Sequence, residues 1–125
     1  KNGAPSIEKC DQCHFFVADQ WLVFPEKIIR GYHVRTQVPG HLESEIWDVD
    51  LKVTVTHNGE DFDSHHETIH LGTPGPETYT FLYDYNLASD APAGHYEIKS
   101  VWRRNVGEYP SETMVCALVT FDLEE

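Results

Sequence analysis

The sequence predicts an all-β protein built as an antiparallel β-sandwich of about seven strands. Two features of the 125-residue chain predict this fold. Short runs in which apolar and polar residues alternate recur along the chain, with the two-residue period of half-buried strands. Turn signals rich in Gly, Pro and Asn separate these runs at intervals of about a dozen residues, and no run keeps a helical period beyond a turn or two. The length fits one domain, residues 1–125.

Prolines mark the ends of the first two predicted strands. Residues 15–24 form the first strand, which Pro25 ends, and residues 32–38 form the second, which Pro39-Gly40 ends. One face of the second strand carries Tyr32, Val34, Thr36 and Val38. We therefore expect that face to pack on the core.

The third and fourth strands are predicted as a hairpin. Residues 49–56 alternate strictly between apolar and polar side chains over eight positions, which is the clearest strand pattern in the chain. Asn58-Gly59 follows, a pair that favours tight hairpin turns. Residues 61–71 then form the fourth strand, and Gly72 and Pro74 begin a loop.

The last three predicted strands supply most of the large apolar side chains. Residues 79–87 place aromatic side chains on one face, with Tyr79, Phe81, Tyr83 and Tyr85 in sequence. Residues 95–103 and 115–123 repeat the alternation, separated by a polar loop. The inward positions of these two strands include Tyr96, Ile98, Trp102, Val119 and Phe121.

The charge of the chain excludes some partners. The 9 basic and 21 acidic residues give a net charge of −12, which repels phosphate backbones, so we expect no nucleic-acid partner and a monomeric protein. The 8 histidines reduce this negative charge when they protonate in an acidic compartment. No segment approaches the roughly 20 apolar residues that a membrane-spanning helix needs.

The three cysteines leave several pairings open. A bridge from Cys10 or Cys13 to Cys116 would tie the N-terminal segment to the last strand, and the odd count leaves one thiol spare. The Cys10-x-x-Cys13 spacing also occurs in zinc and redox sites, but only Cys116 remains as a further thiolate ligand, and no βαβ pattern accompanies it. Three free thiols in a cytosolic protein are the remaining alternative.

Several short motifs together resemble one family. The stretch from Pro92-Ala-Gly-His-Tyr, followed by a strand, a polar hairpin and Met114-Val-Cys-Ala-Leu-Val, is similar to the C-terminal half of ML (lipid-recognition) domains. This family includes the Niemann–Pick type C lysosomal cholesterol-transfer protein and plant and fungal phospholipid-transfer proteins. The segment Glu77-Thr-Tyr-Thr-Phe-Leu, the proline at Pro25 and the glycine at Gly31 also fit the family order, so the resemblance covers nearly the whole chain. Further family cysteines are absent from the loop at residues 71–76.

The resemblance implies a fold, a disulfide and a function. It implies immunoglobulin-like topology and a disulfide between Cys10 and Cys116, which leaves Cys13 as a thiol for intermolecular pairing. It implies non-covalent binding, with transfer as a further role, of a lipid or sterol between the two sheets, without enzymatic activity or a cofactor. It implies a secreted protein or one of the lysosomal or endosomal lumen, with a membrane or membrane receptor as transient partner. The inward residues expected to line the cavity are Val53, Val55, Tyr79, Phe81, Tyr96, Ile98, Trp102, Val119 and Phe121.

Two alternatives to a ligand cavity remain. The same alternation describes an extracellular interaction module whose core is filled, because a cavity leaves no signature in sequence. The other alternative is a metal site on a histidine-rich edge. His66-Glu67-Thr68-Ile69-His70 matches the H-E-x-x-H protease pattern, which requires a helix, whereas this segment reads as a strand. On a strand the two histidines share a face but lie roughly 13 Å apart, so a weak zinc or copper site would need His57 or His65 as a further ligand.

Two charged clusters are interpreted as solvated surface. Glu60, Asp61 and Asp63 follow the predicted turn but lack the spacing of a calcium loop. Lys99, Arg103 and Arg104 form the main basic cluster, which we expect to pair with neighbouring carboxylates rather than to hold an anionic head group. No serine lies in a nucleophile motif. The sequence therefore favours binding over catalysis.

Overall fold

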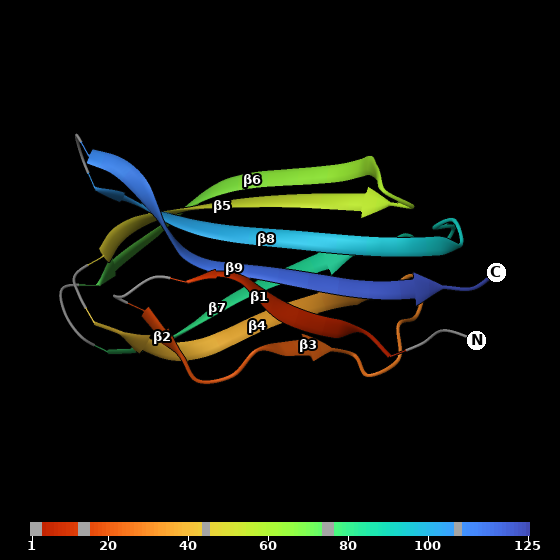
Figure 1. Ribbon diagram of the computed structural model, residues 1–125, viewed down its shortest axis with the longest axis horizontal. Helices are drawn as coiled ribbons and strands as arrows, with labels where there is room; N and C mark the ends of the chain where they lie inside the picture. The colour runs from red at the N-terminus through yellow and green to blue at the C-terminus, as the bar shows by residue number, and fades with distance from the viewer. Residues whose placement is uncertain (1–3, 13–15, 44–45, 74–76, 107–108) are drawn as a thin grey trace.

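The chain folds into two antiparallel sheets packed face to face (Figure 1). The computed structural model describes residues 4–12, 16–43, 46–73, 77–106 and 109–125. Within these ranges the secondary structure consists of strands, and no helix is long and apolar enough to cross a membrane. The strands are β1 (Ser6–Gln12), β2 (Phe16–Ala18), β3 (Leu22–Phe24), β4 (His33–Leu42), β5 (Ile46–His57), β6 (Glu60–Thr73), β7 (Glu77–Asn86), β8 (Gly94–Val106) and β9 (Tyr109–Leu123).

The two sheets differ in width. Sheet A has five strands in the order β1-β9-β8-β5-β6. Sheet B is built on β4, which pairs with β7 along one side and with the short strands β2 and β3, end to end, along the other. β1 lies against β3, so these strands close one side of the sandwich, and β6 and β7 form the edges at the opposite side (Figure 1). The antiparallel immunoglobulin-like sandwich predicted from sequence is therefore confirmed.

The N-terminal strands differ from the prediction. The single strand predicted over residues 15–24 is wrong, because β2 and β3 are separate strands with Asp19, Gln20 and Trp21 between them. The amide of Asp19 donates a hydrogen bond to the carbonyl of Pro39, at 2.8 Å, where the chain leaves one strand before joining the next. β1 was not predicted, because its only apolar residues, Ile7 and Cys10, are three positions apart and do not follow a two-residue period.

β4 continues beyond the predicted stop at Pro39-Gly40. Pro39 is tolerated because it lies between the segments of β4 that pair with β2 and β3, where no partner strand needs its missing N–H, and its carbonyl accepts from Asp19. Gly40 is buried beneath β2, where a Cβ atom would overlap the carbonyl oxygen of Val17. Tyr32, expected on the buried face, lies before the strand with 63% of its surface exposed. Compared with the predicted strand over residues 32–38, β4 therefore begins one residue later and ends four residues later.

The predicted hairpin and core faces are present. Asn58 (φ 51°) and Gly59 (φ 84°) both adopt the left-handed region, which the tight turn between β5 and β6 requires. The inward residues of β5 (Val49, Leu51, Val53 and Val55) are fully buried. The inward residues of β8 and β9 are buried as well, including Tyr96, Trp102 and Phe121.

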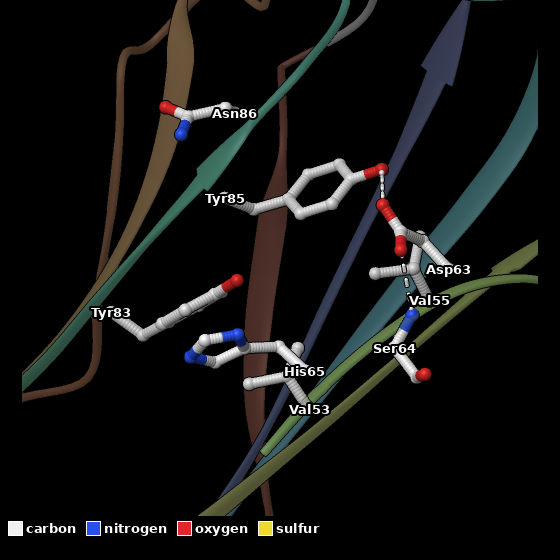
Figure 2. A pocket seen from close by; sticks show the side chains of 8 residues that line it. All are labelled: Val53, Val55, Asp63, Ser64, His65, Tyr83, Tyr85 and Asn86. Atoms are coloured by element: carbon white, nitrogen blue, oxygen red, sulfur yellow. Dashed lines mark hydrogen bonds between the residues drawn. The ribbon is translucent and has the colours of Figure 1, made fainter. Parts of the chain in front are cut away.

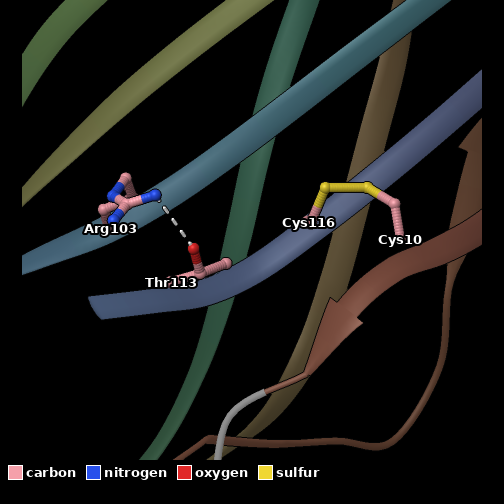
Figure 3. The surroundings of a disulfide bond; sticks show 4 residues. All are labelled: Cys10, Arg103, Thr113 and Cys116. Carbon is pink, nitrogen blue, oxygen red and sulfur yellow. Dashed lines mark hydrogen bonds between the residues drawn. A yellow bond between two sulfur atoms is a disulfide. The ribbon is translucent and has the colours of Figure 1, made fainter. Parts of the chain in front are cut away.

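A disulfide joins Cys10 of β1 to Cys116 of β9, the pairing that the family resemblance implied. The Cα atoms are 5.0 Å apart, and the bridge lies at a register shift between Lys9 and Asp11. Figure 3 shows the bridge beside Arg103 and Thr113, which are joined by a hydrogen bond of 3.3 Å. Because β1 and β9 are neighbours, the bridge fastens the edge strand within sheet A. Cys13 lies outside the described residues.

Candidate functional site

The side of the sandwich between β6 and β7 is the candidate site. β6 pairs only with β5 and β7 only with β4, so no ladder of backbone hydrogen bonds joins these two edges in the described part of the chain. Residues 61–68 of β6 are all exposed, although every second side chain in this segment points toward the interior of the sandwich. The inner face of β6 is therefore left uncovered by sheet B.

A pocket of about 220 Å³ opens between these edges. Val53 and Val55 of β5 form its apolar part, and side chains of β6 and β7 surround them (Figure 2). The lining residues are Val53, Val55, Asp63, Ser64, His65, Tyr83, Tyr85 and Asn86. The pocket thus has two buried valines at its floor and polar and aromatic side chains at its rim.

Side-chain contacts link the two edges across the pocket. The hydroxyl of Tyr85 donates to Oδ2 of Asp63 at 3.2 Å. The rings of His65 and Tyr83 stack with centroids 5.3 Å apart, and Figure 2 shows them side by side at the rim. Nε2 of His65 also lies 3.3 Å from a carboxylate oxygen of Glu67. These contacts close the mouth with side chains rather than with backbone: exposed ones from β6, and a half-buried and a buried tyrosine from β7.

Burial raises the pKa values of both rim tyrosines. Desolvation is the main cause for Tyr83, and the negative charges of Asp63, Glu67 and Asp84 raise its pKa further. Desolvation is also the main cause for Tyr85, followed by the charge of Asp63. Both hydroxyls therefore stay protonated at neutral pH, where they can donate hydrogen bonds, and the field at the mouth is negative.

The predicted lining residues fall into three places. Val53 and Val55 border the pocket. Tyr79 borders a separate surface depression beside Asp19 and Gly40. The others are buried inside the sandwich and do not border the pocket at the β6–β7 edge: Phe81, Tyr96, Ile98, Trp102, Val119 and Phe121.

Ring contacts fill the two ends of this interior. At one end Phe81 packs on Trp102 with ring centroids 5.6 Å apart, and on Phe16 at 4.9 Å. At the other end Tyr96 stacks on Phe121 at 5.1 Å, and the Tyr96 hydroxyl donates to the carbonyl of Pro92. The large aromatic side chains thus pack on one another and stabilise the core.

The H-E-x-x-H segment lies on the exposed strand β6 and not on a helix. Nδ1 of His70 is 2.7 Å from Oδ1 of Asp48, and His65 pairs with Glu67 and Tyr83. Nε2 of His57 is 2.8 Å from the carbonyl oxygen of Ala93. Over the ranges that the structure describes, no three His, Cys, Asp or Glu side chains lie close enough to hold a metal ion.

The basic cluster and the acidic turn lie at the surface. Arg104 is partly buried and lies 3.7 Å from a carboxylate oxygen of Glu112, while Arg103 is exposed and donates to Thr113. Asp63 of the acidic segment is committed to Tyr85 and to the amide of Ser64. This pairing agrees with the interpretation of both clusters as surface charge.

The residues of the pocket rim were not predicted as a set. Tyr83 and Tyr85 were recognised only as part of an aromatic face, and Asp63, Ser64, His65 and Asn86 were not assigned to a cavity. A signal for them exists in the sequence, because Asp63, His65 and Glu67 are polar at the alternate positions that should face the interior. Polar side chains at inward positions indicate a strand that the opposite sheet does not cover.

Comparison with known proteins supports the fold. No protein-family model matches the sequence, and no curated protein matches it. The chain is similar in structure to chicken MD-1, solved as a complex with lipid IVa, with a TM-score of 0.54 and 17% sequence identity. The similarity covers 95% of this chain and 88% of that chain. It shows that the chain has the same immunoglobulin-like sandwich fold.

Proposed function

We propose that the chain binds an amphipathic lipid or sterol, without covalent chemistry, through the side of the sandwich between β6 and β7. The observation that carries the proposal is the pocket between these two edges, with valines at its floor and tyrosine, histidine and carboxylate groups at its rim. The structural similarity to a protein complexed with lipid IVa supports it. Burial of the ligand's apolar surface, at about 25 cal/mol per Å², drives binding.

The rim favours ligands with neutral or cationic head groups. Asp63 and Glu67 carry negative charge at the mouth, in a chain whose net charge is −12. An anionic head group placed there meets like charges in a partly desolvated site. The hydroxyl of Tyr83 offers a hydrogen bond to a neutral polar group, and the ring face of Tyr83 attracts cations.

Binding of a large ligand requires the two edges to separate. The pocket of about 220 Å³ is smaller than the roughly 300 to 1,000 Å³ of sites for drug-sized ligands. Only side-chain contacts hold β6 to β7 among the described residues, so the β6 edge of sheet A can bend away from β7 while β5 keeps its ladders to β6 and β8. We propose that this movement admits the ligand's apolar part toward Val53 and Val55.

Lipid binding of this kind implies a role, a source of ligand and a location for the protein. The protein acts as a binding or transfer protein rather than as an enzyme, and it takes ligand from a membrane or membrane receptor during a transient encounter. The Cys10–Cys116 disulfide supports an oxidising location, either extracellular or in the lysosomal or endosomal lumen. The acidic surface supports a monomer.

A matched pair of variants on β6 tests the proposal. His65→Trp places a bulky side chain at the mouth, while His66→Trp places the same side chain on the outer face of the same strand. Purified proteins are incubated with vesicles of mixed neutral lipids and phosphatidylcholine, separated from them, extracted and analysed by mass spectrometry. We expect stoichiometric lipid with the natural protein and with His66→Trp, and severalfold less with His65→Trp.

One alternative has an observation in its favour. The ring contacts of Phe81, Trp102, Tyr96 and Phe121 fill both ends of the interior, as in an interaction module without a ligand. An extract free of lipid from the natural protein, after incubation with the vesicles, contradicts lipid binding and favours this alternative. Equal amounts of bound lipid in His65→Trp and His66→Trp contradict the proposed position of the mouth beside His65.

A further inference from the structure

Three contacts between the sheets show which rows of inward side chains face each other. Each row runs across the strands of one sheet, because residues paired in register point to the same face. Phe81 of sheet B meets Trp102 of sheet A. One row further, Tyr83 meets His65, and one row beyond that, Tyr85 meets Asp63. The rows of the two sheets therefore follow the same order, and each row faces a defined partner.

The middle row differs from the rows on either side. In sheet A it runs from His65 at the edge through Val53, Ser100 and Ala117. In sheet B it runs from Tyr83 through Thr36 to Val23. Behind the His65–Tyr83 stack, this layer is thus made of small side chains. The rows beside it hold larger ones, such as Trp102 with Phe81 on one side and Ile98 on the other.

Two hydroxyl groups lie in this middle layer without a hydrogen-bond partner. Thr36 is 1% exposed and Ser100 is fully buried, and neither side-chain oxygen has a partner within hydrogen-bonding distance. A buried hydroxyl without a partner destabilises the folded protein, so each such group requires an explanation. One hydroxyl belongs to each sheet, and both residues lie one strand inward from the pocket, Ser100 beside Val53 and Thr36 beside Tyr83.

We propose that Thr36 and Ser100 form a polar subsite that receives a neutral hydrogen-bonding group, a hydroxyl or a carbonyl, carried within the apolar part of the ligand. This inference rests on the proposed lipid binding and specifies the ligand class. A chain that enters past His65 and Tyr83 and lies along the row of small side chains meets Thr36 about one strand spacing, about 5 Å, behind Tyr83, and Ser100 about the same distance behind Val53. Hydroxyls both donate and accept, so the subsite accommodates either group.

The surroundings of the subsite select a neutral group. Val53 and Ala117 flank Ser100, and Tyr83 and Val23 flank Thr36, so the immediate row neighbours of both hydroxyls are uncharged, while His65 and Lys9 stand at the two ends of the sheet A row. A carboxylate or ammonium group there would lose its hydration without a counter-charge. The ligand we infer therefore carries its neutral oxygen inside and leaves any charged head group at the rim.

A competition between two matched alcohols tests the subsite. Vesicles of phosphatidylcholine contain equal amounts of octadecanol and of an octadecanediol whose second hydroxyl lies at mid-chain. After incubation and separation, mass spectrometry gives both the total alcohol bound to the protein and the ratio of the two. One additional hydrogen bond predicts a preference for the diol of about two- to tenfold.

The variants Thr36→Val and Ser100→Ala remove one hydroxyl each, and Thr80→Val changes an exposed threonine on the outer face of β7 as the matched control. We expect the diol preference to fall toward unity in the first two variants, with total alcohol unchanged, and to persist in the control. We also expect the lipid-free form of each subsite variant to be at least as resistant to urea as the natural protein, because an unpartnered hydroxyl has been removed.

Three results would overturn the inference, and they can be told apart. Binding of alcohol with no preference for the diol contradicts the subsite while leaving lipid binding intact. A marked loss of stability in both lipid-free variants shows that the hydroxyls already have partners within the protein. Absence of both alcohols from the natural protein contradicts the proposed function itself, and the subsite with it.

Discussion

Gly40 shows how one residue without a side chain permits two paired strands to approach closely. It is buried in β4 opposite Ala18 of β2 (Phe16–Ala18), and a Cβ atom there would overlap the Val17 carbonyl and crowd the Phe16 ring. Backbone atoms cannot yield to an added methyl group as a flexible side chain can. The close approach of β2 to β4 therefore depends on glycine.

We expect Gly40→Ala to lower the free energy of unfolding by about 1–3 kcal/mol, the usual cost of overpacking. Urea denaturation followed by tryptophan fluorescence measures this loss. Gly59→Ala is the comparison, since Gly59 has open space around it but a positive φ of 84°, and we expect a backbone cost of about 1 kcal/mol there. A Gly40→Ala protein as stable as the natural one would contradict the described contact with Val17.

Asp84 makes the stability of sheet B depend on pH. Its two carboxylate oxygens accept hydrogen bonds from Nε and Nη2 of Arg35 at 2.8 and 3.0 Å, on the outer face between β4 and β7. This hydrogen bonding, with the attraction of the guanidinium charge, lowers the pKa of Asp84. A lowered folded-state pKa means that the unfolded chain binds the proton more readily, so acid favours unfolding.

The contribution of Asp84 is fully present above the pKa of an unfolded aspartate, about 3.9, and is lost as pH falls through its lower folded-state value. We expect Asp84→Asn to be less stable than the natural protein at pH 7 and to lose less stability between about pH 5 and pH 2. Urea midpoints measured across this range test the expectation. Parallel pH profiles for the two proteins would show that the ion pair contributes nothing.

At the scale of single residues, the sequence predicted which side chains face the interior but not which of them border a cavity. Val53 and Trp102 have the same alternating pattern, yet Val53 lines the pocket and Trp102 is packed among aromatic rings. The difference arises from which row of the opposite sheet each one faces. That alignment depends on the packing of the two sheets, which the pattern of a single strand does not contain.

At the scale of the strand, β6 accounts for the misleading protease motif. His66 and His70 point outward from an edge strand, and His70 is held by Asp48 on β5. The β-branched Thr68 and Ile69 favour the extended backbone that prevents the two histidines from meeting at a metal. The match to the H-E-x-x-H pattern thus arises because β6 is an edge strand rich in histidine.

We expect EDTA to leave the melting temperature of the protein unchanged and zinc to raise it by no more than a degree or so. We also expect His70→Ala to change the free energy of unfolding by about 0.5 kcal/mol or less, since both partners of the His70–Asp48 contact are exposed. Differential scanning fluorimetry with and without chelator provides the comparison. A drop in melting temperature that EDTA causes in the natural protein but not in His70→Ala would contradict this view of β6.

The strands most dependent on tertiary context were the hardest to predict. β5, β8 and β9 follow a clear two-residue period because one face of each is buried by the opposite sheet. β1 lacks that pattern because it adds to the edge of sheet A beside β9, and its Ile7 alone is packed against the core. β2 and β3 are short because each pairs with its own three-residue segment of β4, residues 40–42 and 35–37.

At the scale of the whole molecule, the disulfide connects the first strand to the last. Cys10 and Cys116 are separated by 106 residues, so the bridge restricts a large part of the unfolded chain. We expect reduction to lower the free energy of unfolding by about 2–5 kcal/mol. Urea denaturation with and without dithiothreitol tests this, on a Cys13→Ser background that prevents thiol exchange. A Cys10→Ala, Cys116→Ala protein serves as control and should show no effect of the reductant.

The unequal width of the two sheets has a consequence for the thermodynamics of unfolding. Sheet A is five strands wide. Its edge strand β6 is not covered by sheet B, so the inner face of β6 is exposed to water. A lipid lying under β6 would supply the missing cover and become part of the apolar surface that unfolding hydrates. The loaded protein should then unfold with a larger heat-capacity increment and a steeper dependence on urea concentration than the empty one. The apolar surface of the ligand would then contribute to the heat-capacity increment of unfolding as buried apolar side chains do.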